Sequence, residues 1–213
     1  NADFCNGINQ SNYIDGGLAY DGIDTIYSIQ GNNYPSLAKY SISGDSWTPL
    51  KKAPVGFYNG ATLVYDATTN ALYGLAGSSL GEFLKSNIGT NSWAELQDPP
   101  LLHGYGAAQR IIGRYIYTLR GNNTTTFWKY NIDTGLWTKP VMDVFGQNYA
   151  GIIYRPTSNG ASIIQGNGNY IYASRGNADN LFIRYERTTG EVEAMADIPH
   201  GMHVQQRIVI DRT

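Results

Sequence analysis

The feature that most constrains this 213-residue chain is a sequence unit that occurs four times. Each copy contains a short apolar segment that ends in glycine, at residues 25–31, 71–77, 115–121 and 170–176. The third residue of each segment is a tyrosine, and these tyrosines are 46, 44 and 55 residues apart: Tyr27, Tyr73, Tyr117 and Tyr172. A period of this size is typical of proteins built from stacked supersecondary units.

Two further markers repeat with the same spacing. A basic residue and its neighbour follow the glycine after a polar loop, as Lys39-Tyr40, Lys85-Ser86, Lys129-Tyr130 and Arg184-Tyr185. A turn then leads to Trp47, Trp93, Trp137 and Val192. An earlier apolar segment lies at residues 18–20, 62–65, 110–112 and 161–164. Each repeat is therefore predicted to be a β-meander of four short strands, and such sheets bury both faces when they stack radially.

These repeats resemble kelch repeats from about residue 13 to residue 210, in the order apolar strand, Gly-ended strand, Tyr strand and turn to Trp. The resemblance implies an all-β, kelch-like β-propeller of four-stranded blades, as one domain or propeller fragment over residues 1–213. The predicted repeats are 13–54, 55–100, 101–143 and 144–199, with a partial fifth repeat at 200–213. The Gly-Gly pair of the family is reduced to its second glycine, so the chain is a diverged member and no family partner is carried over.

Three segments near the ends of the repeats carry additional predictions. Residues 149–154 are expected to form an extra strand or hairpin. Residues 205–210 resemble 109–112 and predict the first strand of a fifth repeat, and residues 1–8 are expected to supply a last strand. An incomplete ring leaves an open edge. Either the chain is part of a longer propeller, or it self-associates to cover that edge.

Composition narrows the class of protein. Charged residues make up 15%, with 15 Lys+Arg against 17 Asp+Glu, which argues against a nucleic-acid binder. No apolar run reaches the roughly 20 residues of a membrane helix. The single cysteine, Cys5, forms no internal disulfide, and sequons occur at Asn9, Asn122 and Asn123. Low charge with many amides and hydroxyls favours an extracellular or cell-surface location.

The loop before the first strand and the loop after the second strand of a blade are expected at the same end of the sheet. This gathers aromatic, amide and guanidinium groups that suit a sugar or an acidic side chain. The predicted binding residues are Gln30, Asn32, Tyr58, His103, Tyr105, Arg120, Asn122, Arg175, Asn177 and His203. The competing interpretation is structural: aromatics pack loops together and Asn shapes turns.

Catalytic and metal chemistry have little support in the sequence. His103, His200 and His203 could bind zinc or copper, but their placement follows the repeat and no carboxylate or Cys completes a ligand set. Copper-radical oxidases among kelch-like propellers need a Cys joined to a Tyr, and Cys5 has no matching motif. No cofactor or metal is expected. The sequence favours a non-catalytic binding module for a glycan or protein, which could belong to a surface assembly; the alternative is a sugar-acting propeller enzyme, metal-dependent or not, or its accessory domain.

Two structural predictions test the repeat itself. The repeat tryptophans Trp47, Trp93 and Trp137 should be buried between neighbouring blades. The repeat glycines should share one backbone position with positive φ, where a Cβ is poorly tolerated: Gly31, Gly77, Gly121 and Gly176.

Overall fold

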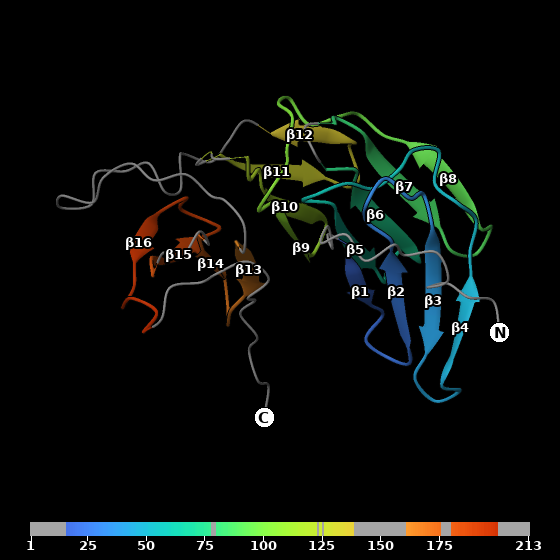
Figure 1. Cartoon of the computed structure of the whole chain (residues 1–213). Coiled ribbons are helices and arrows are strands. Elements are labelled where there is room, and N and C mark those ends of the chain that lie inside the picture. The colour runs from blue at the N-terminus through green and yellow to red at the C-terminus, as the bar shows by residue number, and fades with distance from the viewer. Residues whose placement is uncertain are drawn as a thin grey trace. The chain divides into compact units, whose positions relative to one another are not determined.

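The computed structural model describes residues 16–77, 80–122, 124, 126–138, 161–175 and 180–199, and these form four antiparallel sheets of four strands each (Figure 1). No helix occurs in the part of the chain so described. The chain divides into an N-terminal unit, Asn1–Asp98, and a C-terminal unit, Pro99–Thr213, and each holds two sheets. The predicted strands at residues 1–8, 149–154 and 205–210 lie outside the described residues.

The N-terminal unit contains the first two sheets. The first sheet comprises β1 (Leu18–Tyr20), β2 (Thr25–Ile29), β3 (Leu37–Ser41) and β4 (Ser46–Pro49). The second comprises β5 (Thr62–Asp66), β6 (Ala71–Leu75), β7 (Phe83–Asn87) and β8 (Ser92–Glu95).

The C-terminal unit contains the other two sheets. The third sheet comprises β9 (Ala108–Ile112), β10 (Tyr115–Leu119), β11 (Phe127–Asn131) and β12 (Leu136–Thr138). The fourth comprises β13 (Ser162–Gln165), β14 (Tyr170–Ser174), β15 (Phe182–Glu186) and β16 (Val192–Ala194). In all four sheets the strands pair in chain order, so the predicted four-stranded meander is confirmed.

The repeat markers occupy one register in all four sheets. The tyrosine of the second strand lies opposite the basic residue of the third strand, in the pairs Tyr27–Lys39, Tyr73–Lys85, Tyr117–Lys129 and Tyr172–Arg184. Lys85 lies over its paired Tyr73 at 5.5 Å, whereas Lys129 and Arg184 lie over Tyr115 and Tyr170, two residues before the paired tyrosine, at 4.7 and 4.4 Å. These contacts explain why a basic residue recurs at the marker position, since a cation over an aromatic face is attracted to the ring.

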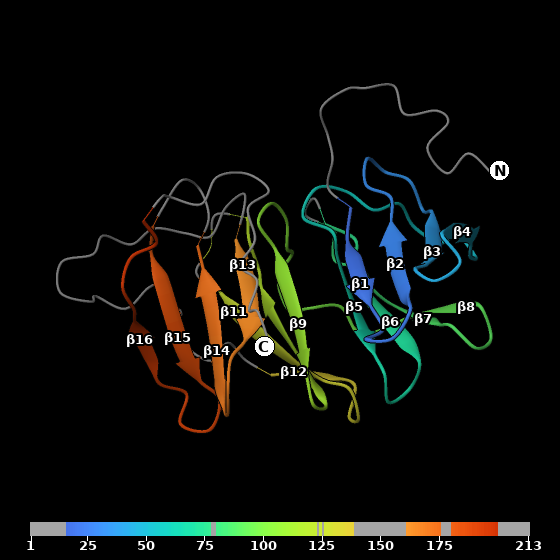
Figure 2. The same cartoon turned by 90° about the horizontal axis from the view of Figure 1, so that it is seen from below.

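Within each unit the two sheets pack face to face. In the N-terminal unit β1 lies beside β5 (Figure 2), and Tyr27 stacks on Tyr65 with ring centroids 5.5 Å apart. In the C-terminal unit β9 lies beside β13, and Phe127 meets Tyr185 edge-on at 5.3 Å. Burial of apolar side chains from facing sheets is the main stabilising contribution in each unit.

The glycine prediction is correct at two of the described positions. Gly77 and Gly121 have φ of 81° and 68°, and a Cβ there would lie 2.7 Å from the Ala61 nitrogen and 2.5 Å from the Ala107 nitrogen. Gly31 does not have a positive φ. In that repeat Asn32 and Asn33 adopt the left-handed conformation instead, with φ of 58° and 65°. Gly176 lies outside the described residues.

The tryptophan prediction is wrong for Trp47, whose side chain is 46% exposed, and the other two indoles are only half-buried. The fourth strand lies at the outer edge of its sheet, and its indole packs on the neighbouring third strand. Trp47 lies 5.1 Å from Tyr40, and Trp137 lies 5.1 Å from Tyr130. These two indoles therefore cover their own sheets, whereas Trp93 lies 6.2 Å from Phe57 and donates to the Lys51 carbonyl at 2.8 Å, outside its own sheet.

Candidate functional site

Two loops of the third sheet meet at one end of the C-terminal unit. The loop of residues 99–107 precedes β9, and the turn of residues 120–122 follows β10. The Gly104 amide donates to the Arg120 carbonyl at 3.2 Å, and the Asn122 amide donates to the Tyr105 carbonyl at 2.7 Å. The expected meeting of these loops is thus confirmed in this sheet, and we call residues 99–107 and 120–122 the loop face.

Arg120 is half-buried at the centre of the loop face. Its Nε donates to the Leu102 carbonyl at 2.6 Å, which fixes the guanidinium against the loop. Burial lowers the pKa of Arg120 from its usual value. Among the described residues no carboxylate forms an ion pair with it. A positioned guanidinium with no counter-charge among the described residues is suited to an anionic or hydroxyl-rich ligand.

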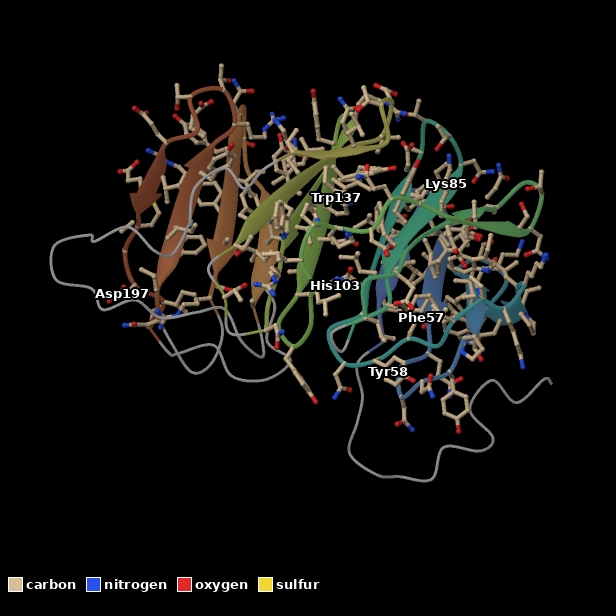
Figure 3. The ribbon with its side chains drawn as sticks, turned by 90° about the horizontal axis from the view of Figure 1, so that it is seen from above. Phe57, Tyr58, Lys85, His103, Trp137 and Asp197 are labelled. Atoms are coloured by element: carbon tan, nitrogen blue, oxygen red, sulfur yellow. The ribbon has the colours of Figure 1, made fainter. Side chains whose placement is uncertain are left out.

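His103 is adjacent to Leu102 and is 1% exposed (Figure 3). Burial and, to a smaller extent, the charge of Arg120 together lower the pKa of His103 to about 4. The imidazole is therefore neutral near pH 7, because its charged form is destabilised by loss of solvent and by a neighbouring cation. It contributes shape and hydrogen-bonding capacity to the loop face, and no charge.

The outer part of the loop face is apolar. Tyr105 is 44% exposed, and Leu101 and Leu102 are 49% and 48% exposed. Asn122 is also exposed and has φ of 51°, so it shapes the turn as well as facing solvent. Sequence reasoning missed the two leucines, although adjacent leucines in a loop outside the strand pattern are a usable signal. Neighbouring exposed apolar side chains commonly mark interaction sites.

A second group, also missed, crosses the third sheet beside the loop face. We call Gln109, Thr118 and Trp128 the polar row, since they lie opposite one another on β9, β10 and β11. Gln109 Nε2 donates to Thr118 Oγ1 at 3.2 Å. Trp128 is 4% exposed, and its Nε1 has no hydrogen-bond acceptor in the described part of the chain. Aligning the four repeats strand by strand would have shown that three polar-capable residues replace mostly apolar ones.

In the N-terminal unit three predicted binding residues lie at the loop end of their sheets. The Asn33 amide donates to the Phe57 carbonyl at 2.7 Å, which brings the turn containing Asn32 beside Tyr58. Figure 3 shows Phe57 among the strands and Tyr58 at their loop end. Asn32 is exposed, whereas Tyr58 and Gln30 are half-buried.

Of the remaining predicted binding residues, one is buried and two lie outside the described part of the chain. Arg175 follows β14 and is 2% exposed, so of the two repeat arginines only Arg120 reaches solvent. Asn177 and His203 lie outside the described residues.

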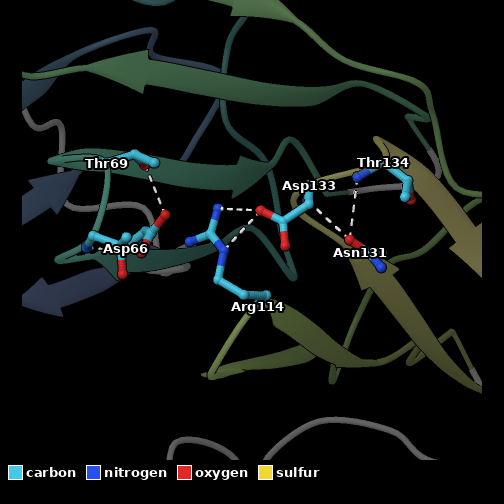
Figure 4. A network of polar contacts seen from close by, with 7 residues as sticks. Asp66, Thr69, Arg114, Asn131, Asp133 and Thr134 are labelled. Atoms are coloured by element: carbon cyan, nitrogen blue, oxygen red, sulfur yellow. Dashed lines mark hydrogen bonds and ion pairs between the residues drawn. The ribbon is translucent and has the colours of Figure 1, made fainter.

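Acidic residues at the opposite ends of the strands stabilise turns (Figure 4). Asp66 accepts a hydrogen bond from the Thr69 hydroxyl at 2.7 Å. In the C-terminal unit Arg114 Nη2 pairs with Asp133 Oδ1 at 2.8 Å, and Asn131 Oδ1 accepts from the Thr134 amide at 3.2 Å. Asp66 thus stabilises the turn after β5, where it also accepts from the Thr68 amide at 3.0 Å, whereas Asp133 binds Arg114 and Asn131 holds the turn after β11. Among the described residues no group of three His, Cys, Asp or Glu side chains could hold a metal ion, and no helix there is long and apolar enough to cross a membrane.

Comparison with known proteins supports the fold of the chain and does not identify its family or its function. No protein-family model matches the chain, and no curated protein matches it. A solved structure titled "Structure of YjhT" matches with a TM-score of 0.66 and 15% sequence identity. The match covers 90% of this chain and 68% of that one. The fold is therefore of the all-β propeller type, and the four-stranded sheets are its blades.

Proposed function

We propose that this protein is a non-catalytic, extracellular binding module whose loop face contacts a glycan or a protein partner. The observation that carries the proposal is the arrangement at the loop face: Leu101, Leu102 and Tyr105 are exposed around a half-buried Arg120. We also propose that the blades are diverged kelch-type repeats. The shared register of the tyrosine and basic markers supports this assignment.

The chemistry of the loop face fits such a partner. The exposed ring of Tyr105 offers an apolar face for a sugar ring or an aliphatic side chain, and its hydroxyl offers a polar edge. Asn122 adds an exposed amide that donates to and accepts from hydroxyl groups. Arg120 is fixed through its Nε, and the Nη groups of its guanidinium are the donors that would bind an acceptor of the partner.

The test replaces Tyr105 with alanine in the full chain. Binding is measured on a glycan array and on intact cells by flow cytometry. We expect a loss of at least about tenfold, as for an aromatic residue central to an interface. Tyr20→Ala is the matched control, because Tyr20 is 54% exposed on β1 and is not part of the loop face.

Equal binding by Tyr105→Ala and the wild type would contradict the proposal. Metal analysis of the purified chain separates it from the enzymatic alternative. Stoichiometric copper or zinc would favour a sugar-acting propeller enzyme.

A further inference from the structure

The polar row of the third blade breaks the pattern of the other three blades. The same three cross-strand positions carry Leu18, Ser28 and Ala38 in the first blade. They carry Leu63, Gly74 and Leu84 in the second, and Ile163, Ala173 and Ile183 in the fourth. Where those blades have aliphatic or small residues, the third blade has an amide, a hydroxyl and an indole N–H.

The indole of Trp128 is the most informative member of the polar row. An aliphatic side chain fills this position in the other blades, and Trp128 fills it with a ring whose Nε1 is buried with no acceptor among the described residues. A buried donor left unpaired is costly, and native proteins rarely retain one without a reason. Because an indole nitrogen only donates, the missing group is a hydrogen-bond acceptor.

Thr118 contributes a second donor on the strand next to Trp128. Its Oγ1 accepts from Gln109 Nε2 at 3.2 Å, so its own hydroxyl proton is left to donate elsewhere. Thr118 is 1% exposed and lies opposite Trp128, on the same face of the sheet. Two neutral donors therefore lie side by side on β10 and β11.

Arg120 extends this face at the end of β10. It is two residues after Thr118, and its amide donates to the Thr126 carbonyl at 3.0 Å, which continues the pairing of β10 with β11. Residues two apart in an extended segment lie on the same face. The guanidinium is consequently on the side of the sheet that carries Thr118 and Trp128, and it is half-buried without a described carboxylate partner.

We propose that Arg120, Thr118 and Trp128, with Gln109 orienting the threonine, form a carboxylate-binding subsite at the inner edge of the loop face. The subsite rests on the proposed binding function and names the group that the ligand presents there. Arg120 supplies the charge, and the indole and hydroxyl donate to the carboxylate oxygens. Charge-assisted hydrogen bonds of this kind are stronger than neutral ones, which matches a partly buried site.

The test follows the indole N–H resonance of Trp128 in ¹⁵N-labelled full-length chain, assigned by its loss in Trp128→Phe. The chain is titrated with sodium acetate, and with acetamide as the uncharged control of the same shape. We expect acetate to move the Trp128 resonance downfield in a saturable manner, and acetamide to leave it in place. Glu and Gln versions of a blocked Gly-X-Gly peptide repeat the comparison and show whether an acidic side chain also enters.

Variants identify the contributing residues. Arg120→Gln and Thr118→Val should each weaken acetate binding, about tenfold for the arginine, since loss of a hydrogen bond to a charged group is of that size. Trp137→Phe is the matched control, because it removes an indole from the outer strand of the same sheet. Thermal melting of every variant reports whether it is folded. If Trp128→Phe proves unstable, Thr118→Val still tests the subsite, because valine keeps the shape of the threonine side chain and removes only its hydroxyl.

The two proposals fail in different ways. A Trp128 resonance that does not move at saturating acetate, or that moves equally with acetamide, overturns the subsite. Tyr20→Ala, outside the loop face, should leave both acetate binding and binding of the whole partner unchanged. If acetate binds as expected and Tyr105→Ala has no effect on partner binding, the subsite stands and the loop face is rejected.

Discussion

Protonation of His103 should make the stability of the fold depend on pH between about 6.5 and 4. The pKa of His103 is lowered from 6.5 to about 4 in the folded chain, first by burial and then by the charge of Arg120. In this window the unfolded chain binds a proton that the folded chain excludes, so lowering the pH favours unfolding. At 1.36 kcal/mol per pKa unit, the shift corresponds to roughly 3 kcal/mol of stability.

The sign and the limits of the window follow from the two pKa values. Above about pH 6.5 His103 is neutral in both states, and its contribution to the free energy of unfolding is constant. Between pH 6.5 and 4 that free energy should fall, and below pH 4 both states are protonated and the fall from this group ends. Asp21, Asp24 and Glu186 have lowered pKa values because backbone and side-chain donors bind their carboxylates, so the stability they contribute is lost at lower pH.

Urea denaturation at pH 7.5, 6.5, 5.5, 4.5 and 4 would measure this effect in the wild type and in His103→Gln. Glutamine keeps hydrogen-bonding capacity and cannot take up the proton. The difference in unfolding free energy between the two proteins should change by roughly 3 kcal/mol over the window, since the carboxylates are common to both. A difference that stays constant from pH 7.5 to 4 would refute the burial of His103 and the description of the loop face that depends on it.

Three substitutions test other parts of the structure, all by urea denaturation at neutral pH. Gly121→Ala should destabilise the fold by about 2 kcal/mol or more, because an added Cβ would collide with the backbone of residues 104–107. Gly113→Ala is the control and should cost only about 1 kcal/mol, since Gly113 also has a positive φ, of 60°, but nothing lies within 4 Å of an added Cβ. Similar losses for the two variants would show that the close backbone contact at Gly121 is absent. Ser174→Ala should change stability by less than about 1 kcal/mol, because the Ser174 hydroxyl is buried and makes no hydrogen bond to the described residues; a larger loss would contradict this. Trp93→Phe should cost about 1 kcal/mol through loss of the 2.8 Å hydrogen bond to the Lys51 carbonyl, and no loss would contradict that bond.

The strands could be predicted from sequence because local pattern determines them. The segment 62–65 was expected as a strand, and β5 is Thr62–Asp66; the segment 115–121 was expected, and β10 is Tyr115–Leu119. Alternating apolar residues bounded by turn residues define a strand without reference to the rest of the chain. The order of pairing followed as well, since short turns between such segments leave neighbours little choice except antiparallel pairing.

Burial could not be predicted in the same way. Trp47 and Trp93 carry the same marker, yet Trp47 is 46% exposed while Trp93 packs near Phe57 and donates to a carbonyl of the preceding blade. Which face of a sheet is covered depends on the sheet that packs against it, and a repeat motif does not contain that information. Gly31 fails for a related reason, because Asn32 and Asn33 can adopt the left-handed conformation that Gly77 and Gly121 supply elsewhere.

The candidate site is found where the repeats differ, and the shared markers are used in packing. Lys129 lies over Tyr115 at 4.7 Å, and Gly121 lies against the backbone of residues 104–107, so these markers are engaged in holding the blade together. Arg120 has Ala76 at the equivalent position of the second blade, where the Tyr58 amide donates to the Ala76 carbonyl and no side chain is needed to hold the loop. The third blade adds a guanidinium to this backbone contact, and it adds Trp128 where packing alone is met by Leu84. The second blade holds its loop and fills this position without these groups, which is why we propose that Arg120 and Trp128 serve ligand binding in the third.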